Sequence, residues 1–378
     1  MTSPAGAFFE QKREWSRRKH EVLEGYLAPF WRIVGRDGKP VYVVDGFAGR
    51  GEFGEGRERE DGSPLLAAKI AYELADTGRY SPFCINVEAD VAEYERLVAV
   101  TRPYADRVEN LRGPFADHVD GTLARIGMRP SMFFLDPFGP GGLEWTTLEK
   151  IGRRPKHLKT EILINVNAPK VDRHAGWLDS FGQKPRPAFL RLLDRIFGCE
   201  DWQLLWEQPA PSEVRYQRIT AFYLKRVHEV FGFGGAVYPV RTVETGQLKY
   251  HMLFFTRHPL GLRIMNSIMY GVEERYLKDR AHFLGRFARQ MDMFAEPEPD
   301  IEEVEAQAVR ELEHDILALG RRRITMTFGG VQDELLHKWF GRMVEKHFRQ
   351  ACARLIDQGH IDRKDSRGIT DKTILEFR

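Results

Sequence analysis

The stretch VYVVDGFAGRG at residues 41–51 decides the fold of this chain. It begins with a β-branched run, which is typical of a buried strand. It ends in the pattern D-x-F-x-G-x-G, in which Gly49 and Gly51 allow the backbone to turn sharply and to approach a ligand closely. A helical pattern then opens with Ser63 as the predicted cap and Pro64 in the first helical position. Strand, glycine-rich turn and helix in this order predict a ligand site at the carboxyl end of a strand.

The alternation of strands and helices continues as far as residue 166. Apolar or β-branched runs predict strands, and apolar residues at three- and four-residue spacing predict helices. Alternation at this spacing implies right-handed crossovers and a mostly parallel sheet. Inside the first helix, Pro29 predicts a kink or break near Ala28. The predicted strands are 41–44, 83–87, 108–111, 131–135 and 160–166, and the predicted helices are 10–34, 63–76, 91–100 and 115–126.

Two further apolar runs, 236–243 and 250–256, are joined by a Thr-Gly turn and predict an antiparallel hairpin at the sheet edge. Residues 168–212 carry five prolines and three tryptophans, and we predict that they form an insertion after the fifth strand. These elements predict an α/β domain over residues 1–295. Its sheet is expected to be Rossmann-like, mostly parallel, with the hairpin as its antiparallel edge.

The character of the chain changes after the segment EPEPD at 296–300, which is the predicted linker. A helix is predicted at 301–319, a second begins at Val331, and a third covers 343–358. Two short strand-like pieces with a glycine turn follow. Helices in this order with a terminal hairpin predict a winged helix-turn-helix over residues 301–378.

Acidic residues follow two of the predicted strands. Glu88 is placed to accept hydrogen bonds from both ribose hydroxyls of an adenosine group, or it is an exposed glutamate before a helix, where the helix dipole favours it. Asp117 is placed to reach an adenine amino group or to cap its helix. The aromatic-rich first helix is expected to be a lid or a packing helix over the sheet rather than a ligand cage; the alternative is that Trp15, Lys19 and Tyr26 close over a cofactor.

The segment Asp136-Pro137-Phe138 ends an apolar strand in the middle of the predicted sheet. A carboxylate there is placed to face a substrate amine or base. The prolines and glycines of this segment are also turn formers, but a turn does not explain why an acid ends the strand. The GxGxxG spacing for NAD and the P-loop spacing for nucleoside triphosphates are both absent, which argues against hydride transfer and against NTP hydrolysis.

In this order the three signals resemble the class I methyltransferases that use S-adenosylmethionine. D-x-F-x-G-x-G is similar to their first motif, Glu88 to their ribose acid, and Asp136-Pro137-Phe138 to the D-P-P-Y loop of amino methyltransferases acting on nucleic acid. The chain has D-P-F-G instead of D-P-P-Y, which departs from the pattern for a flipped-base amine. The resemblance implies S-adenosylmethionine as cofactor and a catalytic role for Asp136, Pro137 and Phe138. The cofactor-binding residues that it implies are Asp45, Phe47, Ala48, Gly49, Gly51, Ser63, Glu88 and Asp117.

A narrower resemblance covers nearly the full length. The segments VDGFAGRG, FFLDPFG, ILINVN and YHMLFFTRHPLGLRIMNSIM are similar to the three-Cys-motif partner family, TcmP, and the tail resembles the winged-helix module often attached to it. This resemblance implies a radical-SAM-like partner protein that carries three cysteines. The scattered Cys84, Cys199 and Cys352 of this chain are not that motif, and we predict no metal site.

Two segments are locally basic, although the whole chain has a formal charge of only +2. Residues 150–195 hold eleven Lys and Arg against four Asp and Glu, and residues 321–378 hold thirteen against eight. A basic rim draws an anionic substrate, although most charge runs are ordinary solvated surface. In a winged helix the last helix would enter a major groove, although many winged helices bind proteins instead. The predicted nucleic-acid contacts are Lys170, Arg173, Arg342, Lys346, Arg349, Arg363, Lys364 and Arg367.

Composition bounds the class of protein. Hydrophobic residues make up 42% and charged residues 30%, which is typical of globular proteins with a sizeable core. Widely spaced cysteines predict a reducing compartment, and the absence of an apolar run near 18 residues predicts a cytoplasmic protein with no membrane partner. Three functions remain open. The chain is a methyltransferase acting on nucleic acid or a modified nucleotide, a methyltransferase acting on a peptide or small molecule with a radical-SAM-type partner, or a non-catalytic DNA-binding adaptor.

Overall fold

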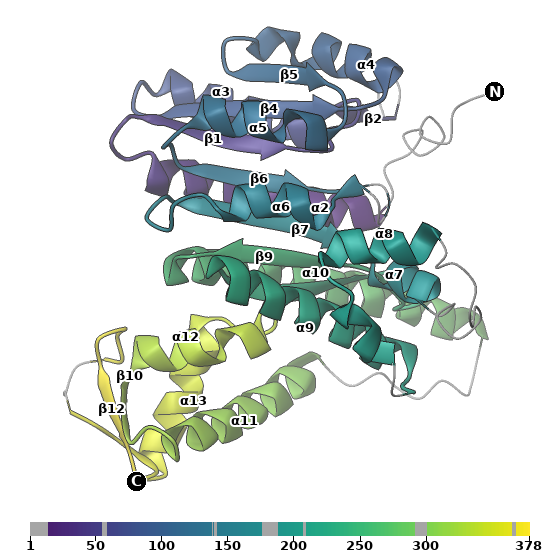
Figure 1. The fold of residues 1–378 in the computed structure, drawn as a ribbon. Helices are drawn as coiled ribbons and strands as arrows, with labels where there is room; N and C mark the ends of the chain where they lie inside the picture. The colour runs from purple at the N-terminus through teal and green to yellow at the C-terminus, as the bar shows by residue number, and fades with distance from the viewer. Residues whose placement is uncertain are drawn as a thin grey trace. The chain divides into compact units, whose positions relative to one another are not determined.

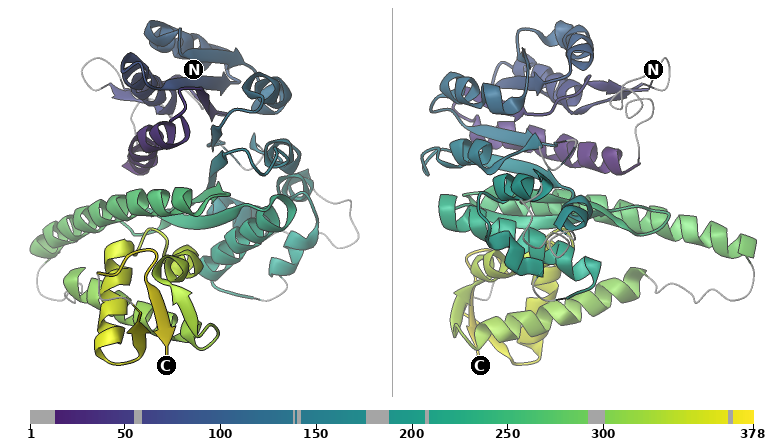
Figure 2. Two further views of the ribbon diagram at one scale, coloured as in Figure 1. Left: turned by 90° about the vertical axis from the view of Figure 1, so that its left-hand side faces the viewer. Right: turned by 45° about the vertical axis from the view of Figure 1, so that its right-hand side comes forward.

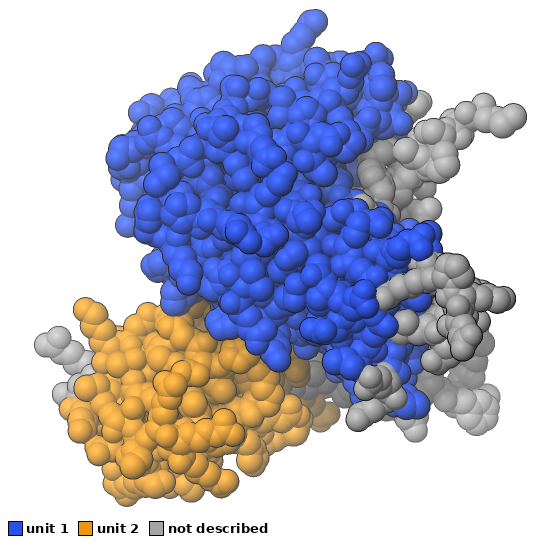
Figure 3. Space-filling model, in the orientation of Figure 1, with its two compact units in different colours: residues 1–242, 246–262 blue, residues 243–245, 263–378 orange. Residues whose placement is uncertain are grey.

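The computed structural model describes residues 14–54, 59–137, 139, 142–175, 188–206, 209–291, 301–364 and 368–378. The chain forms two compact units, residues 1–242 with 246–262 and residues 243–245 with 263–378 (Figure 3). This division falls inside helix α10 (Pro259–Met291). The predicted linker at 296–300 lies outside the described residues, so that boundary stays a prediction.

The first unit is built on a seven-stranded sheet in the order β5-β4-β1-β6-β7-β9-β8 (Figure 1). The first five of these strands run parallel, and β9 pairs antiparallel with both β7 and β8. The predicted Rossmann-like sheet with an antiparallel edge hairpin is therefore confirmed. The strands are β1 (Pro40–Asp45), β4 (Ser81–Glu88), β5 (Val108–Arg112), β6 (Ser131–Leu135), β7 (Thr160–Val166), β8 (Gly234–Arg241) and β9 (Leu248–Thr256).

Helices cover both faces of this sheet (Figure 1, Figure 2). On one face, alternate strand residues such as Ile162 and Ile164 join an apolar core with helix residues such as Phe197 and Tyr223. That core extends into the segment 168–212, so the predicted insertion packs against the sheet. The remaining elements of the unit are α2 (Glu14–Val34), β2 (Glu52–Phe53), β3 (Glu60–Asp61), α3 (Ser63–Asp76), α4 (Val91–Thr101), η2 (Arg102–Tyr104), α5 (Phe115–Ile126), α6 (Trp145–Gly152), α7 (Ala168–Ala175), α8 (Ala188–Phe197), η5 (Asp201–Trp206) and α9 (Ser212–Phe231).

Helix α2 continues through Pro29, so a break near Ala28 is wrong, and a kink there stays a prediction. A proline inside a helix removes one backbone hydrogen bond and crowds the carbonyl four residues earlier, which here belongs to Gly25. The neighbouring Tyr26 and Phe30 are buried, with exposed fractions of 2% and 3%. Their packing in the core holds the helix together against the local cost of the proline.

Strands β1 and β6 are neighbours, but the chain continues from them in opposite directions across the sheet. From β1 it continues to β4 on one side, and from β6 to β7 on the other. This is the switch point of the sheet, and in open α/β sheets ligands bind beyond the carboxyl ends of the strands at such a point. Asp45 ends β1 opposite Phe134 of β6, so the loops that follow the two strands leave the sheet side by side.

The second unit contains most of helix α10, followed by helices α11, α12 and α13 and a small antiparallel sheet in the order β10-β12-β11. Its core gathers side chains from the last three helices and from this sheet, including Trp339, Phe348 and Leu375. The helices and terminal hairpin expected here are present, and their assignment as a winged helix stays a prediction. The elements are α11 (Ile301–Gly320), β10 (Thr325–Thr327), α12 (Phe328–Trp339), α13 (Glu345–Asp357), β11 (Ile361–Arg363) and β12 (Ile374–Phe377).

Candidate functional site

A pocket of about 160 Å³ opens at the carboxyl ends of β1 and β6, at the switch point. It is formed by the loop after β1, the start of α3 and the loop after β6. The structure therefore brings together most of the predicted site residues. Those that line the pocket are Phe47, Ala48, Gly49, Gly51, Ser63, Asp136 and Pro137. Phe138 lies outside the described residues.

The loop after β1 uses its own N–H groups to hold its shape. Gly49 and Gly51 have positive φ angles of 63° and 85°, which favour glycine. Four successive N–H groups donate inside the protein: Gly46 to Phe134 O (3.0 Å), Phe47 to Asp45 Oδ1 (3.1 Å), Ala48 to Val87 O (3.0 Å) and Gly49 to Glu88 Oε2 (2.7 Å). Phosphate sites in nucleotide-binding loops use such N–H groups for the ligand. Residues 46–49 therefore do not form a phosphate cradle.

Asp45 does not line the pocket, and its side chain holds the loop through hydrogen bonds. Its side chain accepts hydrogen bonds from Phe47 N and, at 2.6 Å, from the Ser63 hydroxyl. Burial raises the pKa of Asp45 to about 7, although these two hydrogen bonds act in the opposite direction. Ser63 is not the helix cap that we predicted: the cap position of α3 is Gly62, and Ser63 is the first helical residue with its hydroxyl directed to Asp45.

Glu88 also acts on the loop rather than lining the pocket. Its carboxylate accepts from Gly49 N and from Asp90 N, both at 2.7 Å, and burial raises its pKa. The alternative of an exposed glutamate before a helix is wrong, since Glu88 is 6% exposed. Asp117 is exposed in the first turn of α5 and is not among the residues that line the pocket; Pro114, not Asp117, occupies the cap position.

A buried ion pair ties the loop to helix α4. The Arg50 guanidinium donates to both carboxylate oxygens of Glu93, at 2.5 and 2.8 Å, and the two side chains are only 11% and 6% exposed. Bidentate pairs of this kind fix geometry as well as charge. The glycine-rich loop is thus anchored to α4 as well as to the sheet.

Asp136 stands at the wall of the pocket between two donors. Its Oδ2 forms an ion pair with Lys19 Nζ, and its Oδ1 accepts a hydrogen bond of 2.7 Å from Asn165 Nδ2. The Tyr250 ring lies 5.9 Å from the Lys19 ammonium. Burial, together with the charge of Asp136, raises the pKa of Tyr250. Lys19 and Asn165 thus position the Asp136 carboxyl group, which remains one-quarter exposed.

Helix α2 supplies part of the pocket wall, including Lys19. Tyr26 instead points into the core, where its hydroxyl donates to Glu161 Oε2 at 2.6 Å. The side chain of Trp15 lies outside the described residues. Sequence reasoning gave no site role to the other lining residues, which come from several segments of the chain: Ser16, His20, Phe53, Gly62, Asn167 and Tyr250.

The predicted nucleic-acid residues lie on different parts of the fold. Lys170 and Arg173 are on α7, directly after β7, and Arg173 is exposed. Arg342 lies before α13, which begins at Glu345. The Arg342 guanidinium lies 4.9 Å from the centre of the Trp339 ring.

The other basic residues of the second unit mostly face carboxylates. Ion pairs join Lys346 to Glu305, Arg349 to Glu345 and Lys364 to Glu376. His347, also expected on the groove-facing helix, is 1% exposed and hydrogen-bonded to Glu305 at 2.6 Å. Arg363 is exposed on β11, and Arg367 lies outside the described residues. A nucleic-acid interface on this unit stays a prediction.

Comparisons with known proteins give likenesses only to solved structures. No family model and no curated protein matches the sequence. A protein from Legionella pneumophila is 11% identical over 69% of this chain and 90% of that chain, with a TM-score of 0.42. An O-methyltransferase from Bacillus cereus in complex with SAH is 13% identical, over 67% and 86% of the two chains, with a TM-score of 0.35. The O-methyltransferase TomG from Streptomyces achromogenes, in complex with SAM, is 14% identical over 67% and 93%, with a TM-score of 0.32.

The described residues contain no group of His, Cys, Asp or Glu side chains that would hold a metal ion. Among the helices of those same residues, none combines the length and the apolarity needed to cross a bilayer. What the pocket binds must therefore be inferred from the geometry of the switch point, the engaged N–H groups of the loop and the carboxyl groups around it.

Proposed function

We propose that this protein is a methyltransferase that uses S-adenosylmethionine. The observation that carries the proposal is the pocket at the switch point, where the N–H groups of residues 46–49 are engaged internally and the carboxyl groups of Asp45, Glu88 and Asp136 lie around the loop. A dinucleotide would require free N–H groups for its phosphates. A cofactor with sulfonium and ammonium charges and no phosphate suits an acidic surrounding instead.

The residues of the chain divide into two roles. Phe47, Gly49 and Gly51 would contact the cofactor directly, because they line the pocket. Asp45 and Glu88 act as positioning residues, since each accepts hydrogen bonds from the loop. This arrangement differs from the predicted contact of Glu88 with the ribose, because Glu88 does not line the pocket and each of its carboxylate oxygens accepts a hydrogen bond from a backbone N–H group.

S-adenosylmethionine supplies an electrophilic methyl group and leaves as S-adenosylhomocysteine. With the cofactor bound, the acceptor's nitrogen, oxygen or sulfur would form the new bond to the methyl carbon as the carbon–sulfur bond breaks, and Asp136 would accept the acceptor's proton. Asp136 suits this role because it is partly exposed at the pocket wall and held by Lys19 and Asn165. Orientation of the nucleophile and removal of its proton are the contributions that the protein makes.

We also propose that the protein works with a macromolecular partner. The resemblance to the three-Cys-motif partner family supports a radical-SAM-like protein, with the predicted winged helix as its docking module. The ion pairs of Lys346, Arg349 and Lys364 favour a protein over DNA or RNA, because each charge already faces a carboxylate. Nucleic acid is the competing partner.

Calorimetric titration with S-adenosylmethionine tests the proposed function. We expect the wild type to bind it and Gly49→Val to lose at least tenfold in affinity, because Gly49 lines the pocket at a φ of 63°. Gly78→Val is the matched control: its φ is 68°, an added Cβ meets nothing within 4 Å, and it lies outside the pocket. A wild type that does not bind the cofactor would overturn the proposal.

A further inference from the structure

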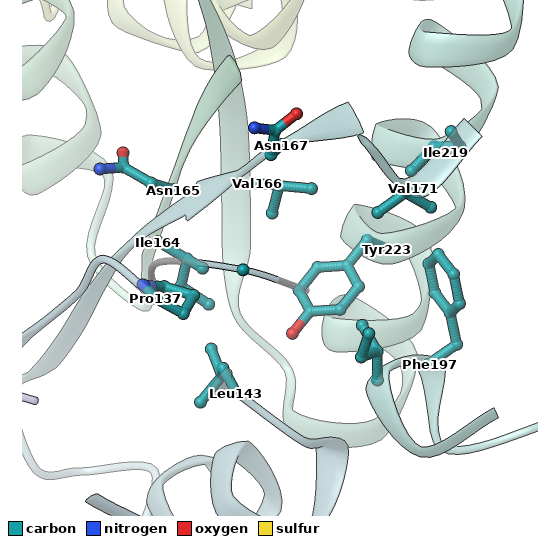
Figure 4. A pocket seen from close by; sticks show the side chains of 12 residues that line it. Pro137, Leu143, Ile164, Asn165, Val166, Asn167, Val171, Phe197, Ile219 and Tyr223 are labelled. Atoms are coloured by element: carbon teal, nitrogen blue, oxygen red, sulfur yellow. The ribbon is translucent and has the colours of Figure 1, made fainter. Parts of the chain in front are cut away.

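A second pocket lies beside the first and differs from it in chemistry. Pro137 and Asn167 line both pockets, so the two share a wall at the loop after β6. The second pocket extends towards the core between β7, α8 and α9. Figure 4 shows Ile164 and Val166 of β7 on one side of it and Leu143 on another.

The described lining of this pocket carries no charged side chain. Most of it is aliphatic or aromatic, including Val171, Phe197 and Ile219. Its volume is about 50 Å³. That is several times the ~10–15 Å³ that one water needs, and well below the ~150 Å³ of a cavity known to admit benzene. The size fits a short branched alkyl group and is too small for an aromatic ring.

Three of the side chains that line this mostly apolar space are polar: Asn165, Asn167 and Tyr223. The Tyr223 hydroxyl points between Pro137 and Leu143 in Figure 4. Tyr223 is 3% exposed, and no hydrogen bond joins its hydroxyl to another residue that the structure describes. Because the Tyr223 hydroxyl faces the pocket, a ligand atom or a water can be its hydrogen-bond partner.

The Tyr223 ring is fixed by its neighbours. It packs against Trp145, Phe197 and Phe255, with ring centres 6.1, 6.2 and 6.4 Å away. Burial raises the pKa of Tyr223, so the hydroxyl stays neutral and can donate a hydrogen bond. The hydroxyl is therefore held in one place, among walls that are mostly apolar.

We propose that this pocket, which we call the tail pocket, receives a neutral, short aliphatic part of the methyl acceptor and pairs one of its oxygen or nitrogen atoms with the Tyr223 hydroxyl. The inference rests on the proposed methyltransferase function. When this aliphatic part occupies the tail pocket, the nucleophilic atom of the acceptor lies at the wall that the two pockets share, on the side of Asp136. The acceptor is then a small molecule or an aliphatic side chain, and neither a phosphate nor a nucleobase enters the tail pocket.

The test uses the full chain and three probes of one shape. Isobutanol has a branched alkyl group and one hydroxyl, isobutyl thiol replaces the hydroxyl by a weaker hydrogen-bonding group, and isobutyrate carries a charge. Binding is measured by ligand-observed NMR. We expect the wild type to bind isobutanol about five- to tenfold more tightly than the thiol, which is the usual worth of one hydrogen bond, and not to bind isobutyrate.

Two variants locate the binding in the tail pocket. Tyr223→Phe keeps the ring and should remove the preference for isobutanol over the thiol, whereas Tyr216→Phe on the same helix, outside the pocket, should not. Val166→Phe should fill the space and weaken both probes more than tenfold, and Val230→Phe, at an exposed position of α9, should not. Binding of isobutyrate, or binding unaffected by Val166→Phe, would overturn the proposal.

A cofactor arm separates this proposal from the proposed function. Val166→Phe should bind S-adenosylmethionine as the wild type does, because Val166 does not line the first pocket. With cofactor and isobutanol present together, cross-relaxation is expected between the S-methyl group and the isobutanol methyls. If no such cross-relaxation is seen, the tail pocket does not receive the methyl acceptor, but the methyltransferase function is not refuted. The same holds if the protein methylates an oligonucleotide and the Val166→Phe variant methylates it equally well. Failure of the wild type to bind the cofactor would instead refute the methyltransferase function.

Discussion

At the scale of single residues, Lys19 contributes a positive charge to the pocket at the switch point, where we propose that S-adenosylmethionine binds. Its ammonium pairs with Asp136, so Lys19→Met leaves that carboxylate with only Asn165 as donor and makes the pocket more negative by one charge. S-adenosylmethionine has one positive charge more than S-adenosylhomocysteine, at sulfur. We expect the affinity ratio of the two to shift about tenfold towards S-adenosylmethionine in calorimetry. Arg32→Met, at an exposed position of the same helix, is the control and should leave the ratio unchanged.

Glu161 predicts a pH dependence of stability. Burial raises its pKa to about 7 from an ordinary value of 4.5, although Tyr26 and Thr256 both donate to it. Because the folded state holds this proton more tightly than the unfolded state, the contribution is fully present below pH 4.5 and is lost as the pH rises through about 7.

Glu161→Gln should therefore flatten the change of unfolding free energy with pH between about 4.5 and 7, by up to about 1.4 kcal/mol for each pH unit. Urea unfolding at a series of pH values measures it. Glu24→Gln, at an exposed position of α2, should follow the wild type. A Glu161→Gln curve that runs parallel to the wild-type curve would contradict the assignment.

At the scale of elements, the anchor between the glycine-rich loop and α4 can be broken from one side. Glu93→Ala leaves the Arg50 guanidinium buried without its partner carboxylate. Loss of one partner of a buried pair costs ~3–5 kcal/mol. We expect a loss of this size in urea unfolding, together with weaker binding of S-adenosylmethionine. Glu95→Ala, exposed on the same helix, should change neither; equal stability of the two variants would show that the pair is not an anchor.

Elements were predictable wherever local pattern decides structure. The bounds of β6 and β7 agree with the prediction. In β6, every residue of Ser131–Leu135 is buried, so the sequence there is mostly apolar and is readily predicted as a buried strand. The structural predictions made from Pro29 and from Ser63 differ from the structure for two separate reasons. Tertiary packing carries α2 across the proline, and the Ser63 hydroxyl, which local rules assign to a cap, is used by Asp45 from another element.

At the scale of the whole molecule, the switch point was predictable and the completed site was not. The motifs after β1 and β6 identify two walls of the pocket, since each follows a recognisable strand. Lys19 and Tyr250 lie 117 and 114 residues from Asp136 in sequence, and nothing local in either segment indicates that they meet it. The apolar lining of the tail pocket likewise looks like ordinary core in the sequence, because its members come from separate strands and helices.

The charge of the chain also has to be judged on the folded molecule. The segment 321–378 holds thirteen Lys and Arg, but in the second unit ion pairs connect many of these to carboxylates, among them Lys338 to Asp315, Arg354 to Glu313 and Arg378 to Asp362. DNA phosphates would have to compete with these carboxylates. We therefore expect the full chain to bind duplex DNA weakly, releasing few counterions.

Fluorescence anisotropy of a labelled duplex between 50 and 200 mM salt measures this. A protein that neutralises six to ten phosphates loses ~10³–10⁵ in affinity over such a range, whereas we expect a loss of about tenfold. Arg342→Ala tests a predicted contact whose guanidinium lies 4.9 Å from the centre of the Trp339 ring; Arg96→Ala, exposed on α4 of the first unit, is its control. A steep salt dependence that Arg342→Ala reduces would favour nucleic acid as the partner of the second unit, and a shallow one favours the protein partner.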